Sequence, residues 1–462
     1  MPVIYSARWV LPIDSPVIEN GAVAVAVEES NIIAVGRRTE IVSRFPDSPV
    51  EDFDEAAILP GLVNAHSHLE LTVMRGFLER EENDFFAWLR KLTLARLAMT
   101  EEDLLVSATC GAIEAARAGV TCLGDASSAA APGMKALQAV GLRGVVYQES
   151  FGPDPRLADE NVAQLREQLS ELRTLEDQLV GVGVSPHAPY TVSGRQLELI
   201  SRLALDEHIP LMMHAAESQA EKLFMLKGLG PFAEGLTARG IEWQAPGIST
   251  IQYLHRHGML ETRPLFAHCI NVDDADLELI RQSHSGVAHC PKSNAKLGHG
   301  RAPFAGLIAH GINVGLGSDS VASNNTCDIL EEARSATLLA RLTASGDVSG
   351  RGPLTAPDLV TAEQALFAAT LGGARALGRD DRIGALAPGM QADITVVGLD
   401  GPHQQPVRDP SVALVFASSG RDVLLTMVAG KEIYRDGRMI GLDEITFLER
   451  LGQLRTKIDS TA

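Results

Sequence analysis

The chain has 462 residues, 45% of them hydrophobic, and no low-complexity tract, so we expect a globular protein with one large domain and an accessory unit. Its formal net charge of −19 argues against nucleic-acid or anionic-membrane partners, because those interfaces need clustered Lys and Arg. The five cysteines include no CxxC pair, and the N-terminus lacks the pattern of a signal peptide. We therefore expect a cytoplasmic protein with no membrane segment.

The two ends of the chain are predicted to be rich in short strands. Residues 1–58 and residues 388–440 both contain short apolar runs separated by turns. We expect these flanks to pair with each other as a small β-sandwich. Asp443 to Ile458 is predicted to be a surface helix. The expected domains are therefore 1–58, 59–387 and 388–462, with the last containing the second part of the sandwich and the helix.

Between the flanks, short apolar runs alternate with amphipathic helical patterns. One such helix opens with Thr100 and Asp103 as a capping box, and another covers Ser193 to His208. Eight alternations predict an α/β protein with a (β/α)8 TIM barrel. An open doubly wound sheet is the alternative, but its Gly-rich phosphate turn is missing after the first strand. The predicted strands are 59–65, 119–124, 143–149, 180–186, 209–214, 263–268, 285–290 and 312–318.

The first predicted barrel strand ends in "NAHSH", with His66 and His68 two positions apart. Residues i and i+2 of a strand face the same side, so both imidazoles can reach one ion. A second His-x-His pair, His255 and His257, follows a helical pattern in which such residues point apart. We expect that second pair to lie at the surface or at a helix cap.

Every predicted barrel strand is followed by a polar residue that can do chemistry. Active sites of this barrel type form at the carboxyl ends of the strands. His66, His68, His214 and Asp319 suit one Zn²⁺, or Fe²⁺, with room for a water molecule. Glu217 is placed for acid–base work, and His268 to stabilise developing charge. For Asp125, Glu149 and His289 the sequence allows two roles: each could orient other side chains of the site or face the substrate.

Two further features narrow the chemistry. No lysine follows the fourth strand, so we see no bridging carbamate and expect one metal ion rather than two. Nucleobase deaminases of another type need H-x-E with P-C-x-x-C, whereas here Cys290 precedes Pro291. That class is excluded.

The motifs "PGLVNAHSHLE", "SPHAPYT", "HAAES", "AHC", "CPKSN" and "LGSDSVASNN" occur in this order. Together they resemble the amidohydrolase superfamily, and most closely its adenosine-type deaminase and chlorohydrolase branch, which includes the methylthioadenosine/S-adenosylhomocysteine deaminases. The resemblance implies a TIM barrel that holds one divalent metal ion on His66, His68, His214 and Asp319. It also implies a homodimer. Three catalytic roles follow from it: Asp319 takes a proton from the nucleophilic water, Glu217 protonates a ring nitrogen, and His268 supports the nucleophile.

The resemblance also suggests how a small-molecule substrate is held. The homocysteine-nucleoside deaminases carry an acidic residue beyond the Trp of "FFAWL", and "RKLTLARLA" has none. The "HSHLEL" and "FFAWL" segments look more like the aminodeoxyfutalosine deaminases. The expected substrate-binding residues are Trp88 and Arg75 near the pocket mouth, His187, Ser323, Glu70 and Arg143.

Two other readings remain open at the level of the sequence. The same metal site could hydrolyse a different bond, in a chlorotriazine, a pterin, guanine or a cyclic amide. Glu217 favours deamination of an adenine-like ring, because such a ring needs protonation on nitrogen. The chain could also be a non-catalytic scaffold paralogue, although every ligand and acid–base position is filled.

Overall fold

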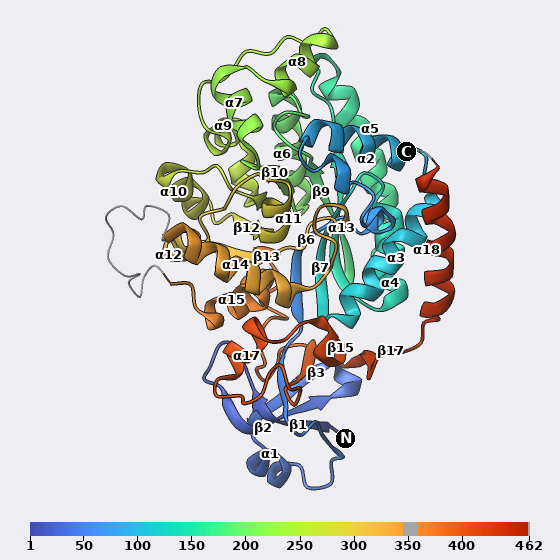
Figure 1. Cartoon of the computed structure of the whole chain (residues 1–462), viewed down its shortest axis with the longest axis vertical. Helices are drawn as coiled ribbons and strands as arrows, with labels where there is room; N and C mark the ends of the chain where they lie inside the picture. Colours follow the sequence, from blue (N-terminus) through green and yellow to red (C-terminus); the bar gives the residue numbers. More distant parts are fainter. Residues whose placement is uncertain (345–358, 461–462) are drawn as a thin grey trace.

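The computed structural model describes residues 1–344 and 359–460 (Figure 1). Its centre contains two four-stranded parallel sheets, in the orders β6-β7-β8-β9 and β10-β11-β12-β13. Each of the eight predicted strands overlaps one of these. The first sheet contains β6 (Leu62–Ser67), β7 (Val120–Ser127), β8 (Arg143–Ser150) and β9 (Val180–Pro186). The second contains β10 (Met212–Ala215), β11 (Leu265–His268), β12 (Gly286–His289) and β13 (Asn313–Leu316).

The two parallel sheets meet at both of their edges. One isolated parallel bridge joins Val184 to Leu211, and another joins Ser67 to Asp319. These strands are buried on both faces, as is usual for parallel strands covered by helices. The strand order brings the carboxyl ends of β6 and β13 together, where His66 and Asp319 lie.

Helices cover the outside of the parallel sheets (Figure 1). The capping box of Thr100 and Asp103 is present at the start of α3, and Ser193 caps α6, as predicted. The helices after the first four strands are α2 (Phe85–Leu97), α3 (Glu101–Arg117), α4 (Ala130–Val140), α5 (Ala158–Arg173) and α6 (Gly194–Glu207). Those that follow are α7 (Gln219–Lys227), α8 (Pro231–Ala238), α9 (Thr250–Arg256), α10 (Asp274–Gln282), α11 (Pro291–Lys296), α12 (Phe304–Ala309), α13 (Val321–Asn324), α14 (Ile329–Ala344), α15 (Ala362–Ala369) and α16 (Leu371–Ala376).

The N- and C-terminal flanks share one nine-stranded sheet, below the parallel strands in Figure 1. Antiparallel pairing of β5 with β14 joins the two flanks, which confirms that they pair with each other. The predicted domain boundary after residue 58 falls inside β5. The sheet order is β17-β16-β15-β14-β5-β1-β2-β3, with β4 on β1. Its strands are β1 (Val3–Val10), β2 (Ile18–Ala26), β3 (Asn31–Arg37), β4 (Val50–Asp52), β5 (Ala56–Pro60), β14 (Ile394–Gly398), β15 (Val423–Val428), β16 (Lys431–Arg435) and β17 (Arg438–Met439).

Three helices accompany the flanks: α1 (Arg38–Arg44), α17 (Pro410–Phe416) and α18 (Glu444–Asp459). The predicted C-terminal helix is α18, and it packs along α3 rather than on the nine-stranded sheet. Leu454 and Ile458 are its buried residues, while most of its other side chains face the outside.

Arg143 does not lie where the substrate was expected. It is the first residue of β8, so it sits at the end of the strand opposite to the metal-site residues. Its guanidinium makes two hydrogen bonds of 3.0 Å to the carboxylate of Asp393, just before β14. Both side chains are buried. The prediction that Arg143 binds substrate was wrong, because this residue clamps the parallel strands to the nine-stranded sheet.

We predict that Arg143→Met lowers the free energy of unfolding by about 3–5 kcal/mol, because it leaves the Asp393 carboxylate buried without its partner. Denaturant unfolding of the purified protein measures this change. The matched control is Arg281→Met, which breaks an exposed ion pair with Glu278 and should leave the free energy of unfolding nearly unchanged. If Arg143→Met instead has unchanged stability and a raised KM, Arg143 is a substrate-binding residue after all.

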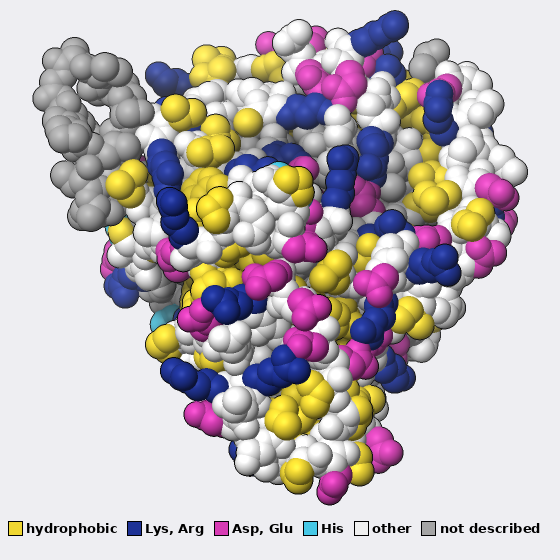
Figure 2. Space-filling view, turned by 60° about the horizontal axis from the view of Figure 1, so that its bottom comes forward, with side chains coloured by type: hydrophobic (Ala, Val, Ile, Leu, Met, Phe, Trp, Pro, Cys, Tyr) yellow, Lys and Arg dark blue, Asp and Glu magenta, His cyan; other side chains and the backbone are white. Residues whose placement is uncertain are grey.

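The surface is mixed in charge. On the face shown in Figure 2, Lys and Arg side chains are interspersed with Asp and Glu, unlike the continuous basic surface that nucleic-acid binding requires. Among the described residues, no helix combines the length and the apolar character needed to cross a membrane.

Candidate metal centre

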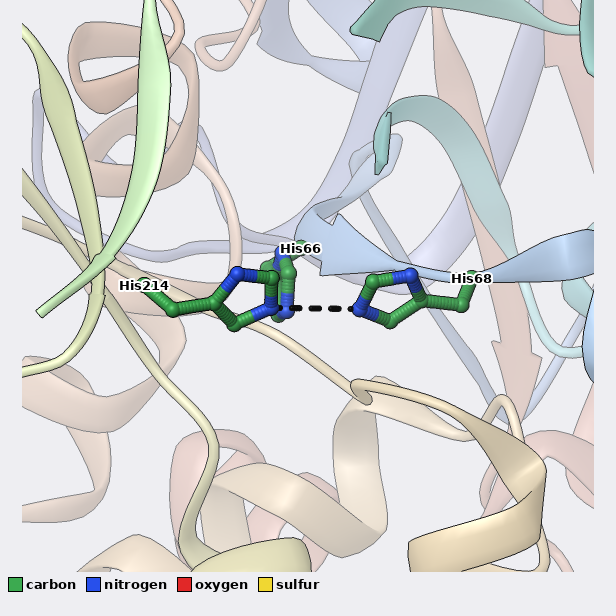
Figure 3. Close-up of side chains that lie close together, drawn as sticks. All are labelled: His66, His68 and His214. Carbon is green, nitrogen blue, oxygen red and sulfur yellow. Dashed lines mark hydrogen bonds between the residues drawn. The ribbon is translucent and has the colours of Figure 1, made fainter. Parts of the chain in front are cut away.

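Three histidines and one aspartate converge at the carboxyl ends of the parallel strands. His66 is the last residue but one of β6, His68 directly follows that strand, His214 lies in β10, and Asp319 follows β13. The Nε2 atoms of His68 and His214 are 3.3 Å apart (Figure 3). Oδ1 of Asp319 is 3.4 Å from Nε2 of His66 and 3.6 Å from Nε2 of His68. The structure therefore brings the four predicted ligands together.

The imidazoles of this cluster are held in the form that binds metal. Burial lowers the pKa of His68 to about 4, helped by the neighbouring charge of His66. The pKa of His214 is also lowered by burial. Nδ1 of His214 donates to the carbonyl of His187 at 2.9 Å, which leaves the Nε2 lone pair free. Neutral imidazoles with one nitrogen fixed by a hydrogen bond are typical metal ligands.

The donor set fits a divalent metal ion such as zinc. Nitrogen and oxygen ligands at roughly 2.0–2.1 Å from a tetrahedral zinc ion lie about 3.4 Å from one another, close to the distances between these four atoms. Nε2 of His66 is buried and has no hydrogen-bond partner among the described residues. Such an atom costs free energy unless something binds it. A metal ion held by His66, His68, His214 and Asp319 would supply the missing partner.

Asp319 is held for this role by two serines. Ser293 and Ser323 both donate from Oγ to Oδ2 of Asp319, which leaves Oδ1 facing the histidines. Burial acts to raise the pKa of Asp319, but the nearby His66 and His268 outweigh it and keep the pKa well below its ordinary value. Ser323 was expected to contact substrate. In the structure its buried hydroxyl donates to the aspartate.

Strained backbone also marks this end of the strands. Ala216, His268, Cys269 and Asp319 have φ values between 47° and 75°, which side chains other than glycine rarely adopt. Such strain persists only where the surrounding structure enforces it, and it clusters at functional sites. Here it occurs at His268, the last residue of β11, and at Asp319, three residues beyond β13.

Glu217 and His268 lie beside the metal-type ligands. Oε1 of Glu217 is 3.7 Å from Nε2 of His268, and its Oε2 is 3.5 Å from the hydroxyl of Tyr190. Nδ1 of His268 is bonded to Oδ1 of Asn294 at 2.8 Å, so its Nε2 faces the site. Burial raises the pKa of Glu217 above that of an ordinary glutamate, with His299 opposing the shift. Burial therefore favours the protonated form of the Glu217 carboxyl.

Glu221 holds the loop that carries Glu217. The carboxylate of Glu221 accepts hydrogen bonds of 2.8 Å from the backbone N–H groups of Ala216 and Glu217. Thr250 donates to the same carboxylate at 2.7 Å. Ser218 caps α7 and accepts from the N–H of Glu221, so the "SQAE" spacing after the strand was a usable signal that sequence reasoning missed.

His299 is a second residue that sequence reasoning missed. Its Nε2 is buried, lies 3.6 Å from Oε1 of Glu217 and has no hydrogen-bond partner among the described residues. The edge of its ring meets Phe85 of α2, with centroids 4.5 Å apart. His299 lies ten residues beyond β12, so no strand-end pattern pointed to it.

The remaining predicted substrate residues divide into two groups. His187 lies in the site, with its ring centroid 4.8 Å from that of His214. Buried Trp88 stacks on Phe85 and so lies one aromatic ring away from His299. Glu70 is buried against Arg96, 2.9 Å away. Arg75, by contrast, is directed outward into an ion pair with Glu114 of α3, and none of its described contacts is with a metal-site residue.

Asp125 and His289 also have definite places. Oδ1 of Asp125 accepts from the Ser67 hydroxyl at 2.9 Å and from the N–H of Leu69 at 2.8 Å, so it orients the turn that carries His68. The ring of His289 stacks on Phe304 with centroids 5.0 Å apart. Burial lowers the pKa of His289 to about 3, so its imidazole is neutral.

A large cleft of about 800 Å³ lies at the other, amino-terminal end of the strands. None of the metal-type ligands lines it. His208 and Arg263, which do, each follow the last residue of a helix, where a basic side chain offsets the partial negative charge of the helix end. The cleft is therefore separate from the candidate metal centre.

Comparison with known proteins identifies the family of this chain. Residues 57–433 match the model of the amidohydrolase family, and this chain belongs to that family. A curated relative, the 5-methylthioadenosine/S-adenosylhomocysteine deaminase of Nitratidesulfovibrio vulgaris strain Miyazaki F, is 33% identical over 446 residues, which cover 95% of this chain and 93% of the relative.

Solved structures show the same architecture over nearly the whole chain. An adenosine deaminase from Xanthomonas campestris with bound zinc has a TM-score of 0.83 at 28% identity and covers 99% of this chain and 98% of its own. The aminofutalosine deaminase of Helicobacter pylori, in complex with methylthio-coformycin, has a TM-score of 0.74 at 23% identity and covers 94% of this chain and 100% of its own. The second similarity supports the fold alone.

Proposed function

We propose that this protein is a zinc-dependent hydrolytic deaminase that releases ammonia from the aminated ring of a nucleoside-type substrate. The observation that carries the proposal is the placement of Glu217, a buried carboxyl of raised pKa, beside four metal-type ligands and His268. The deaminase names of curated relatives and the zinc in a structural neighbour support the same reaction and cofactor.

The chain's own residues account for the proton transfers of such a reaction. A zinc ion bound by the four ligands would lower the pKa of a water molecule so that it attacks a ring carbon at neutral pH. Oδ1 of Asp319 accepts the proton that this water gives up. The carboxyl of Glu217 gives its proton to the ring nitrogen, and Nε2 of His268, whose Nδ1 hydrogen goes to Asn294, accepts a hydrogen bond from the nucleophilic water. Asp319 then gives its proton to the leaving amino group, and the hydroxyl on the ring carbon returns one to Glu217, so that the carbon becomes a carbonyl and ammonia leaves.

The finer architecture and setting belong to the same proposal. The edge bridges between the two parallel sheets support a closed (β/α)8 barrel spanning 59–387, with the flanks 1–58 and 388–462 as a small β-sandwich and C-terminal helix. A cytoplasmic homodimer that takes a small-molecule substrate is the expected form. Aminodeoxyfutalosine leads the candidate substrates, and S-adenosylhomocysteine and methylthioadenosine follow.

We predict that the zinc-loaded protein releases ammonia from at least one adenine nucleoside in a panel. The panel contains aminodeoxyfutalosine, S-adenosylhomocysteine, methylthioadenosine, adenosine, guanine and a chlorotriazine, and ammonia or chloride release is measured. Deamination of one nucleoside names the substrate. Chloride release alone, or silence across the panel with zinc bound, would contradict the deaminase proposal and favour another leaving group or a cyclic amide.

A further inference from the structure

Glu149, at the carboxyl end of β8, has a carboxylate that the metal centre does not use. Its Oε1 is buried and has no hydrogen-bond partner among the described residues. A carboxylate oxygen of Glu149 lies within 4.8 Å of ring nitrogens of His187 and His214. A buried polar atom without a partner costs free energy, so a carboxylate in this position indicates a ligand that binds beside the metal centre.

A second metal ion on Glu149, His187 and His214 is the first alternative, and the hydrogen bonding of His214 argues against it. Nδ1 of His214 donates to the carbonyl of His187, so it has no lone pair for a metal. Its Nε2 faces Nε2 of His68 in the metal centre already described. Only Glu149 and His187 would remain, and two protein ligands are too few for a typical site.

Arg96 of α2 provides a donor on the same side of the centre. Its Nε donates a hydrogen bond of 2.9 Å to Oε1 of Glu70. The side chain is 19% exposed, so its two terminal amino groups can donate to a ligand. Burial raises the pKa of Glu149 to about 8, with the charge of Glu70 adding to the shift and that of Arg96 opposing it.

The charges around this pair select the kind of ligand. The charges of Glu70 and Asp125, both buried, act on Glu149 as well, so the surroundings of this carboxyl are rich in acidic groups. An anionic group placed against Arg96 would also meet these carboxyl groups. A hydroxyl group suits the pair better, because it donates to a carboxylate oxygen and accepts from a guanidinium N–H at once.

We propose that Glu149 and Arg96 bind the sugar hydroxyls of the substrate, so that the protein selects a nucleoside over a free aminated ring. This inference rests on the proposed deaminase function. The base then lies over the metal centre beside Glu217, while the sugar lies toward β8 and α2. In this arrangement Glu149, at a strand end, supplies the carboxylate that the segment "RKLTLARLA" lacks, and Arg96 comes from that segment.

The test compares adenosine with 2′,3′-dideoxyadenosine in wild-type protein and in Glu149→Gln. For wild type we expect kcat/KM for adenosine to exceed that for the dideoxy compound by about tenfold or more, mainly through KM, as for a hydrogen bond to a charged group. Glu149→Gln should lose about tenfold or more on adenosine and change little on the dideoxy compound. Arg96→Lys, which keeps a charge beside Glu70, should lower the ratio of kcat/KM for adenosine to kcat/KM for the dideoxy compound. Equal losses on both compounds, or no loss on either, would overturn the proposal.

Calorimetric titration of the zinc-loaded protein with the two nucleosides gives a readout independent of turnover. The Kd for adenosine should weaken about tenfold or more in Glu149→Gln, with the Kd for the dideoxy compound nearly unchanged and the zinc content preserved. Glu160→Gln, on the exposed face of α5, is the matched control. Selective adenosine binding without ammonia release would uphold the sugar site and defeat the deaminase proposal. Ammonia release without selectivity would do the reverse.

Discussion

Glu217→Gln is expected to reduce kcat by about 10²–10⁴-fold, the range in which a positioned acid or base contributes to proton transfer. Glutamine has nearly the same shape, so it can occupy the space between His268, His299 and Tyr190, but it cannot give a proton to the ring nitrogen. The measurement is steady-state ammonia release by zinc-loaded protein with the nucleoside found in the substrate panel.

Two further measurements separate a catalytic loss from a structural one in this variant. Zinc content and the midpoint of thermal unfolding should match wild type, because Glu217 is not among the proposed ligands and its loop is held by Glu221. A loss smaller than about tenfold would remove Glu217 from the role of proton donor. A loss accompanied by missing zinc would show that the glutamate supports the metal instead.

Removal of the metal ion is expected to abolish activity. Without it, the pKa of the nucleophilic water returns from about 7 to about 15.7, and the attack on the ring loses its nucleophile at neutral pH. The thermal midpoint should also fall, because a ligand that binds only the folded protein stabilises it. Chelation followed by metal analysis, activity assay and thermal unfolding tests both effects, and added zinc should restore them. Full activity in metal-free protein would contradict the assignment.

The two His-x-His pairs of the chain provide a matched comparison for the metal site. His66→Ala should lose the bound metal, because His66 contributes a buried Nε2 directed at the other ligands. His257→Ala should keep it, because His257 caps α9 and bonds to Glu198 at the surface of the molecule. Equal metal content in the two variants would exclude His66 as a ligand.

Local periodicity and strand ends were enough to predict that His66, His68, His214 and Asp319 come together. His66 and His68 face one side because they lie two residues apart at the end of a strand, and that relation is set within a few residues. Parallel strands then bring their carboxyl ends to one side of the sheets, so His214 and Asp319 could be placed with them. The same local logic predicted the capping box at Thr100 and the alternation of strands and helices.

Contacts between distant segments decided what the sequence could not. Arg143 opens its strand, and only the pairing of β5 with β14 puts Asp393 beside it. Ser323 donates to Asp319 across a turn in which Asp319 has a positive φ. His299 comes near Glu217 through a loop whose path no strand period encodes. The amino-acid order thus determined which residues end each strand and share a face, because that geometry is local, whereas the partner of each buried charge depended on tertiary packing between residues far apart in the chain.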